Sequence, residues 1–251
     1  MVTDSNNEHR QRPIRGPADF AATFNVSRET IAALAAYEGL LRQWQKAMNL
    51  VASGTLDAIW SRHFADSAQL LPLAATARTW VDLGSGAGFP GLVIAILLAD
   101  REMSPTPQRH PQEGGEPPAQ ATARVSLVES NVRKCAFLRE VVRQSGISAG
   151  VAVDILSTRI EIAATQASLK APDVVSARAL APLDKLLALA APLFASSTVG
   201  LFLKGRDVAA ELRAAESLWN FNLELVPSCT DGDARIVVIR NLERKNEGIN
   251  P

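Results

Sequence analysis

The chain has 251 residues, of which 47% are hydrophobic and 21% are charged, and its 26 Lys and Arg balance 26 Asp and Glu. This composition is typical of a globular protein with a full hydrophobic core, and the zero net charge excludes a global field that attracts nucleic acid or membrane. Residues 1–17 are polar, and the longest apolar run, residues 91–99, is too short to cross a bilayer, so we expect a cytoplasmic protein without a signal peptide.

The first part of the chain predicts a helical cap. Residues 1–20 are expected to form a flexible tail. Ser27 can cap a helix that extends to about Met48, and a second amphipathic helix is expected from Thr55 to about Leu71, because apolar residues recur every three to four positions in both. We therefore expect a cap of residues 21–76, a larger domain of residues 77–242 and a C-terminal tail of residues 243–251.

From Thr79 onward, short apolar strands alternate with amphipathic helices, a pattern typical of a doubly wound α/β sheet. Strands are expected at residues 79–83, 124–129, 151–155, 173–177, 198–203, 222–227 and 234–240, with helices at about residues 90–98, 131–144, 158–168, 182–194 and 207–218. The last two strands predict an antiparallel hairpin that closes a mostly parallel, seven-stranded sheet. Residues 101–123, rich in Pro and Gly, are expected to form a surface insertion.

The stretch Val81-Asp82-Leu83-Gly84-Ser85-Gly86-Ala87-Gly88-Phe89-Pro90-Gly91 joins a strand to an apolar helix. Its alternate glycines predict a tight turn that a ligand can approach closely. The dinucleotide fingerprint has its third glycine where this chain has Phe89, so a nicotinamide or flavin cofactor is the weaker interpretation. Glu129 is the last residue of the second strand. An acidic residue at this position can accept hydrogen bonds from both hydroxyls of a ribose. The alternative interpretation is an acid that only stabilises the N-terminus of the next helix. The turn and Glu129 favour a methyltransferase but leave an oxidoreductase open.

Six stretches together resemble the ribosomal RNA small-subunit methyltransferase G family (RsmG, also called GidB). They are residues 44–50, Arg62-His63-Phe64-Ala65-Asp66-Ser67, residues 82–91, residues 128–134, Ser176-Ala177-Arg178-Ala179 and Lys204-Gly205. The glycine turn is shared by many methyltransferases, whereas the two blocks at 62–67 and 176–179 are more specific. The resemblance implies a Rossmann-like, class I fold and S-adenosylmethionine-dependent methylation of N7 of a guanine in 16S rRNA.

The resemblance also implies site residues and partners. S-adenosylmethionine would be bound by Gly84, Gly86, Gly88, Phe89, Glu129, Ile160, Glu161 and Arg178, with Arg178 and His63 as residues that position the reactants. No metal is expected, and guanine N7 has a lone pair and no proton, so transfer needs alignment rather than a general base. The expected partner is 16S rRNA, within the small ribosomal subunit or an assembly intermediate, and the expected state is a monomer without membrane contact.

Three alternatives remain open at this point. A methyltransferase that acts on a small molecule is the first, and an NAD-dependent oxidoreductase is the second. A ribosome-binding module without enzymatic activity is the third. Lys204, at the end of the fifth strand, would either meet RNA phosphate or be solvated.

Overall fold

The computed structural model describes residues 14–103, 123–147 and 150–245. Most of the insertion expected at 101–123 lies outside the described residues. Helix α4 (Gly91–Met103) continues past its expected end at residue 98, and strand β2 begins at Ala123.

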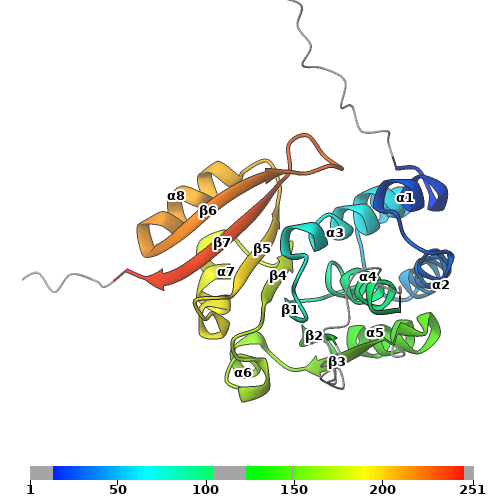
Figure 1. Ribbon diagram of the computed structural model, residues 1–251, viewed down its shortest axis with the longest axis horizontal. Coiled ribbons are helices and arrows are strands. Elements are labelled where there is room, and N and C mark those ends of the chain that lie inside the picture. Colours follow the sequence, from blue (N-terminus) through cyan, green and yellow to red (C-terminus); the bar gives the residue numbers. More distant parts are fainter. Residues whose placement is uncertain (1–13, 104–122, 148–149, 246–251) are drawn as a thin grey trace, which may run out of the picture.

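A seven-stranded sheet forms the centre of the protein (Figure 1), with the strand order β3-β2-β1-β4-β5-β7-β6. The strands are β1 (Thr79–Leu83), β2 (Ala123–Glu129), β3 (Val151–Ser157), β4 (Val174–Arg178), β5 (Val199–Lys204), β6 (Trp219–Pro227) and β7 (Arg235–Arg244). The first five pair in parallel, and β7 pairs antiparallel with both β5 and β6. The predicted strands and the antiparallel closing hairpin are confirmed. The order reverses between β1 and β4, where such sheets bind ligands beyond the carboxyl ends of their strands.

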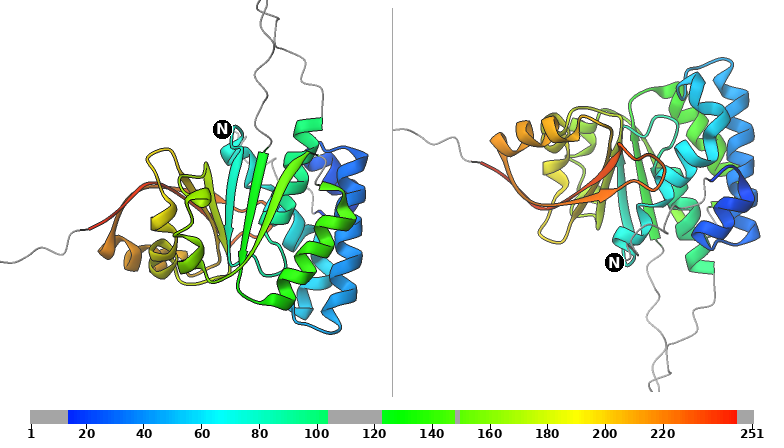
Figure 2. Two further views of the ribbon diagram at one scale, coloured as in Figure 1. Left: turned by 90° about the horizontal axis from the view of Figure 1, so that it is seen from below. Right: turned by 90° about the horizontal axis from the view of Figure 1, so that it is seen from above.

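Helices cover both faces of the sheet (Figure 2). Successive residues of a strand point to opposite faces, and each face has its own core: Trp80 and Leu127 pack with α4 and with α5 (Val132–Ser145), whereas Val81 and Val128 pack on the other side. That second side is covered by α6 (Ile160–Ala163), α7 (Leu183–Ala190) and α8 (Val208–Leu218). The helix expected at residues 158–168 is therefore mostly wrong, because α6 has four residues and only a short 3₁₀ turn, Ala167–Leu169, follows it.

The cap adds another helical layer outside α4 and α5 (Figure 2). Helix α1 (Pro17–Phe24) begins inside the expected tail and buries Phe20 completely, so a flexible tail up to residue 20 is wrong for residues 17–20. Ser27 caps α2 (Arg28–Gln45) as predicted, since its hydroxyl accepts from the Thr30 amide at 3.1 Å. At the other end of the chain, β7 continues to Arg244, so the C-terminal tail expected from residue 243 begins too early.

The second cap helix is not the regular helix expected from residue 55 to residue 71. It is divided into a 3₁₀ helix (Ser53–Ala58), a π-helix (Trp60–Ala65), a single turn α3 (Asp66–Ala68) and another 3₁₀ turn (Leu71–Ala74). The π-helical turn buries three consecutive residues, His63, Phe64 and Ala65. Arg62, the residue before them, is exposed, so this turn has one face toward solvent.

Candidate active site

The glycine turn after β1 has the conformation that its sequence predicts. Gly84, Gly86 and Gly88 have φ angles of 64°, 56° and 93°, in the left-handed region that side chains rarely adopt. The turn places the start of α4 beside the carboxyl end of β2, since the Ser85 amide donates to Val128 O at 3.0 Å.

The three glycines are needed for different reasons. A Cβ atom at Gly84 would come within 2.5 Å of Leu180 Cδ1, and one at Gly88 would come within 2.6 Å of the Tyr37 hydroxyl. At Gly86 the nearest atom of the described chain to such a Cβ is Gly84 O, at 3.7 Å. Neighbouring side chains therefore fill the space beside Gly84 and Gly88, whereas Gly86 leaves room for a ligand.

Glu129 faces this open position from the end of β2. Its Oε2 accepts from the Gly86 amide at 2.9 Å, and its Oε1 accepts from the Asn131 amide at 2.7 Å. The side chain is buried, and each carboxylate oxygen retains a further lone pair for a ligand. Ile160 and Glu161 open α6 beyond the neighbouring strand, and Thr158 joins that turn to Glu129 by donating its amide to Glu129 O at 3.1 Å.

Phe89 points away from Gly86 and into the cap. Its ring stacks on Tyr37 with centroids 5.2 Å apart and on His63 with centroids 4.9 Å apart, and only 4% of the residue is exposed. The Tyr37 hydroxyl also donates a hydrogen bond to Ala87 O inside the turn. Burial raises the pKa of Tyr37 well above its ordinary value, so the hydroxyl keeps its proton. The cap is thus bound to the glycine turn, and a cofactor contact by Phe89 stays a prediction.

The two specific sequence blocks meet in space at Arg178, the last residue of β4. Its guanidinium donates to His63 Nδ1 at 2.9 Å, to Asp66 Oδ2 at 3.4 Å and to Arg62 O at 3.1 Å, and lies 4.8 Å from the centroid of the Phe89 ring. A guanidinium has only donors, so Nδ1 of His63 must accept.

His63 is held neutral in this arrangement. With Nδ1 accepting, its Nε2 carries the hydrogen and donates to Thr55 Oγ1 at 2.8 Å. Burial, followed by the positive charges of Arg178 and Arg62, lowers the pKa of His63 to about 3. His63 therefore orients Arg178 and does not act as a proton carrier near neutral pH.

A series of buried hydrogen bonds joins β1 to β4 just before the glycine turn. Trp80 Nε1 donates to Ser176 Oγ at 2.8 Å, and Ser176 Oγ donates to Asp82 Oδ1 at 2.7 Å. Asp82 is completely buried, which raises its pKa to about 6, although the hydrogen bond from Ser176 opposes the shift.

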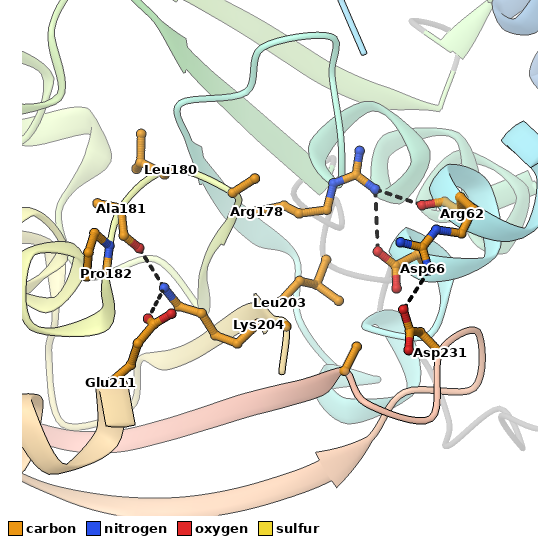
Figure 3. A pocket seen from close by; sticks show the side chains of 13 residues that line it. Arg62, Asp66, Arg178, Leu180, Ala181, Pro182, Leu203, Lys204, Glu211 and Asp231 are labelled. Carbon is orange, nitrogen blue, oxygen red and sulfur yellow. Dashed lines mark hydrogen bonds and ion pairs between the residues drawn. The ribbon is translucent and has the colours of Figure 1, made fainter. Parts of the chain in front are cut away.

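A pocket of about 470 Å³ lies next to the turn, at the carboxyl ends of β4 and β5 (Figure 3). Leu180 lines it and also covers Gly84. Its six charged lining residues form three pairs: Arg62 with Asp231 at 2.6 Å, Arg178 with Asp66 at 3.4 Å, and Lys204 with Glu211 at 2.7 Å. Lys204 is not solvated, because only 8% of its side chain is exposed.

The loop between β6 and β7 supplies the far wall of the pocket. Thr230 donates its hydroxyl to Asp66 Oδ1 at 2.9 Å, and the Cys229 amide donates to Gln69 Oε1 at 2.8 Å. Sequence reasoning missed this docking. It also missed the roles of Tyr37 and Leu180, because their contacts with the turn join residues far apart in the chain, and the role of Glu211, whose partners Leu183 and Lys204 lie on other elements.

Residues 30–104 and 118–237 match the family described as rRNA small subunit methyltransferase G (GidB). The chain belongs to this family. The matched residues include the glycine turn, the two specific blocks and the pocket between them. Membership confirms the family expected from the sequence.

Relatives and solved structures agree with this result. The chain is 50% identical over 224 residues to a ribosomal RNA small subunit methyltransferase G of Parvibaculum lavamentivorans, covering 89% of this chain and 88% of the relative. It is 48% identical to one of Methylorubrum populi, with 88% and 92% covered. The O-methyltransferase TomG of Streptomyces achromogenes, solved with S-adenosylmethionine, has a TM-score of 0.53 at 13% identity, with 94% of this chain and 99% of that chain covered. At that identity the likeness shows the fold alone, a Rossmann-like methyltransferase fold.

Among the described residues of this GidB-family chain, no group of three or more His, Cys, Asp or Glu side chains could hold a metal ion. No helix in the same part of the chain is both long and apolar enough to span a membrane.

Proposed function

We propose that this protein transfers a methyl group from S-adenosylmethionine to N7 of a guanine in 16S rRNA. Its family and the names of its relatives support small-subunit rRNA as the substrate. The observation that carries the proposal is the open face of Gly86, with Glu129 bound to its amide, beside a pocket large enough for a base.

The residues present fit S-adenosylmethionine. The space that a Cβ atom would occupy at Gly86 is open, and the Glu129 carboxylate can accept the ribose hydroxyls. When bound, the cofactor supplies an electrophilic methyl group on a sulfonium. The residues proposed to hold it are Gly84, Gly86, Gly88, Phe89, Glu129, Ile160, Glu161 and Arg178.

The chain would contribute positioning rather than acid–base chemistry. Guanine N7 attacks with a lone pair and releases no proton, so the rate depends on holding the two reactants in line and away from water. The site agrees with this requirement, because His63 is held neutral against Arg178 and Asp82 is sealed beneath the turn. The proposed role of Arg178 and His63 is to join the cap to the carboxyl edge of the sheet, so that the pocket keeps its shape.

The substrate proposed is rRNA within a small subunit or an assembly intermediate, bound by a monomer. The three cations of the pocket are each paired with a carboxylate, and the net charge of the chain is zero. Such a surface gives little of the counterion release that drives binding to naked RNA, so recognition must depend on the folded particle. Equal activity on a short unstructured oligonucleotide would contradict this part of the proposal.

The test uses small subunits from a strain that lacks the gene. Purified protein with labelled S-adenosylmethionine should add one 7-methylguanine to 16S rRNA, mapped by mass spectrometry. Label on a small molecule instead would favour the first alternative, and absence of any transfer would favour a ribosome-binding module. Calorimetry that detects NAD binding and no S-adenosylmethionine binding would support an oxidoreductase.

A further inference from the structure

The Lys204–Glu211 pair on the floor of the pocket has hydrogen-bonding capacity that the fold does not use. The Lys204 ammonium donates to Ala181 O at 2.6 Å and to Glu211 Oε2 at 2.7 Å. The same Oε2 accepts from the Leu183 amide at 2.8 Å. Within residues 14–103, 123–147 and 150–245, Glu211 Oε1 has no donor, and one ammonium hydrogen of Lys204 has no acceptor. One acceptor and one donor are therefore available side by side in the pocket (Figure 3).

We propose that Glu211 determines the base specificity of the enzyme by accepting hydrogen bonds from N1–H and the 2-amino group of the target guanine, while Lys204 donates to O6. The proposal rests on the proposed function, which it deepens by assigning the site of the acceptor base. It makes Oε1 of Glu211 the atom that distinguishes guanine from other purines.

The charge of the pocket favours a base over a phosphate. Its three cations are matched by three carboxylates, so a phosphate would meet as many negative groups as positive ones. A guanine is neutral, and Leu180 and Pro182 supply apolar wall against which its ring can pack. The cavity, about 470 Å³, is large enough for one base with its ribose.

The position of Leu180 relates the pocket to methyl transfer. Leu180 lines the pocket and covers Gly84 of the glycine turn, so a base in the pocket lies beside the place proposed for the cofactor. N7 and N1 lie on different edges of guanine, which meet at O6. A base held through its N1 edge by Glu211 therefore leaves N7 free for the methyl group, whereas a base held through N7 could not react.

Glu211 would contribute to the rate as well as to binding. Methylation places a positive charge on the purine, which makes N1–H and the 2-amino group stronger donors. A hydrogen bond from these groups to a carboxylate strengthens as that charge develops, and an interaction that is stronger in the transition state than in the ground state raises kcat.

The variant Glu211→Gln isolates this role. Its amide oxygen can keep the contacts with Leu183 and Lys204, while an NH₂ group replaces the free Oε1 and repels the guanine donors. We expect kcat on small subunits to fall about 10- to 150-fold, the range that 1.5 to 3 kcal/mol of a charged hydrogen bond gives. Affinity for S-adenosylmethionine should stay at the wild-type value. The midpoint of unfolding should fall, because Lys204, with 8% of its side chain exposed, loses its charged partner, so kcat is measured at a temperature at which the variant is folded.

The matched control is Glu102→Gln. Glu102 is also a partly buried carboxylate in an ion pair, with Arg78, and its exposure of 20% is close to the 25% of Glu211. Glu102 lies at the end of α4, outside the pocket. The Glu102→Gln variant should methylate small subunits at the wild-type rate.

A second measurement tests directly whether Glu211 Oε1 accepts a hydrogen bond from the 2-amino group. With S-adenosylhomocysteine bound, the wild type should bind guanosine monophosphate about tenfold more tightly than inosine monophosphate, which lacks only the 2-amino group. Glu211→Gln should remove that difference, measured by NMR titration. A wild type that methylates small subunits but does not distinguish the two nucleotides, or a Glu211→Gln variant within threefold of the wild-type rate, would overturn the assignment. A wild type that transfers no methyl group to small subunits would instead overturn the proposed function.

Discussion

The contact between the cap and the glycine turn can be tested by removing one oxygen atom. In Tyr37→Phe the ring keeps its stack on Phe89, at a centroid distance of 5.2 Å, and loses only the hydroxyl that donates to Ala87 O. Because burial raises the pKa of Tyr37 well above its ordinary value, the hydroxyl is protonated and can donate this bond at neutral pH.

The expected cost follows from the burial of the acceptor. Ala87 is 4% exposed, so its carbonyl cannot exchange the lost donor for bulk water unless the turn rearranges. An unsatisfied buried carbonyl costs about 1–3 kcal/mol. If the turn stays in place, the cost appears in the free energy of unfolding. If the turn relaxes, part of the cost appears as weaker binding of S-adenosylmethionine, because binding must restore the shape of the turn. The loss of unfolding free energy and the loss of binding free energy should therefore add up to about 1–3 kcal/mol.

Urea unfolding of the free protein measures the first loss, and calorimetry with S-adenosylmethionine measures the second. Trp60→Phe is the control, because it removes a hydrogen bond of 2.7 Å, from Trp60 Nε1 to Glu38 Oε2, inside the same cap. The control should lose stability and keep its cofactor affinity. A summed loss below about 0.3 kcal/mol for Tyr37→Phe would refute the idea that this hydroxyl holds the turn.

Substitutions at Gly86, Glu129 and Asp82 probe the turn and its surroundings, with one control at Gly146. Gly86→Val should abolish detectable S-adenosylmethionine binding in calorimetry, since its side chain fills the open face of the turn, and should cost about 1–2 kcal/mol of stability from its positive φ. Gly146→Val has the same strain at φ 69° on the far end of α5 and should still bind the cofactor. Glu129→Ala should weaken cofactor binding by about 1.5–3 kcal/mol. Glu129→Gln should weaken it less, because an amide oxygen can still accept from the Gly86 amide. Wild-type affinity in Glu129→Ala would exclude the ribose role. Asp82 keeps its proton to about pH 6 in the folded protein but only to its ordinary pKa of 3.8 when unfolded, so its contribution to stability falls as pH rises through that window. Asp82→Asn should lack this fall, and its unfolding free energy relative to wild type should rise by up to about 3 kcal/mol between pH 4 and pH 7 in urea titrations; a difference that is flat with pH would show that Asp82 is not protonated in the fold.

The sheet was predictable because its signals are local. A strand buried on both faces is a short apolar run in the sequence, and here three alternate glycines separate it from the longer apolar run of α4, so β1 and its glycine turn could be located within a residue. The two closing strands were recognised in the same way, as two consecutive strand patterns with no helix expected between them.

The second cap helix was mispredicted in its type, and the reason is tertiary. Periodicity assumes one buried stripe, whereas the segment from Trp60 is enclosed by α1, by the sheet edge at Arg178 and by the β6–β7 loop. In this segment a π-helical turn buries His63, Phe64 and Ala65 together. A pattern in the sequence cannot indicate how many neighbours will surround it.

In the candidate site, too, the residues with local sequence signals could be predicted and the long-range contacts could not. Gly86 and Glu129 follow from a turn motif and a strand end, and they are neighbours through a sheet register that a parallel pair makes predictable. The contacts of Tyr37 with Ala87, of Leu180 with Gly84 and of Arg178 with His63 join elements that are 50 or more residues apart in the chain. The family blocks marked Arg178 and His63 as important, but only the structure shows that they touch.

The docking of the β6–β7 loop on the cap sets the order in which the protein can be completed during synthesis. Arg62 and Asp231 are separated by 169 residues, so the nascent chain can form the cap, the turn and the first strands before the wall of the pocket exists. A fragment that ends before β6 would retain Gly86 and Glu129 and still lack Asp231 and Thr230, the residues that hold Arg62 and Asp66 in place. The pocket proposed for the acceptor base therefore cannot be complete until the loop between the last two strands has been synthesised, although Gly86 and Glu129 come much earlier in the chain.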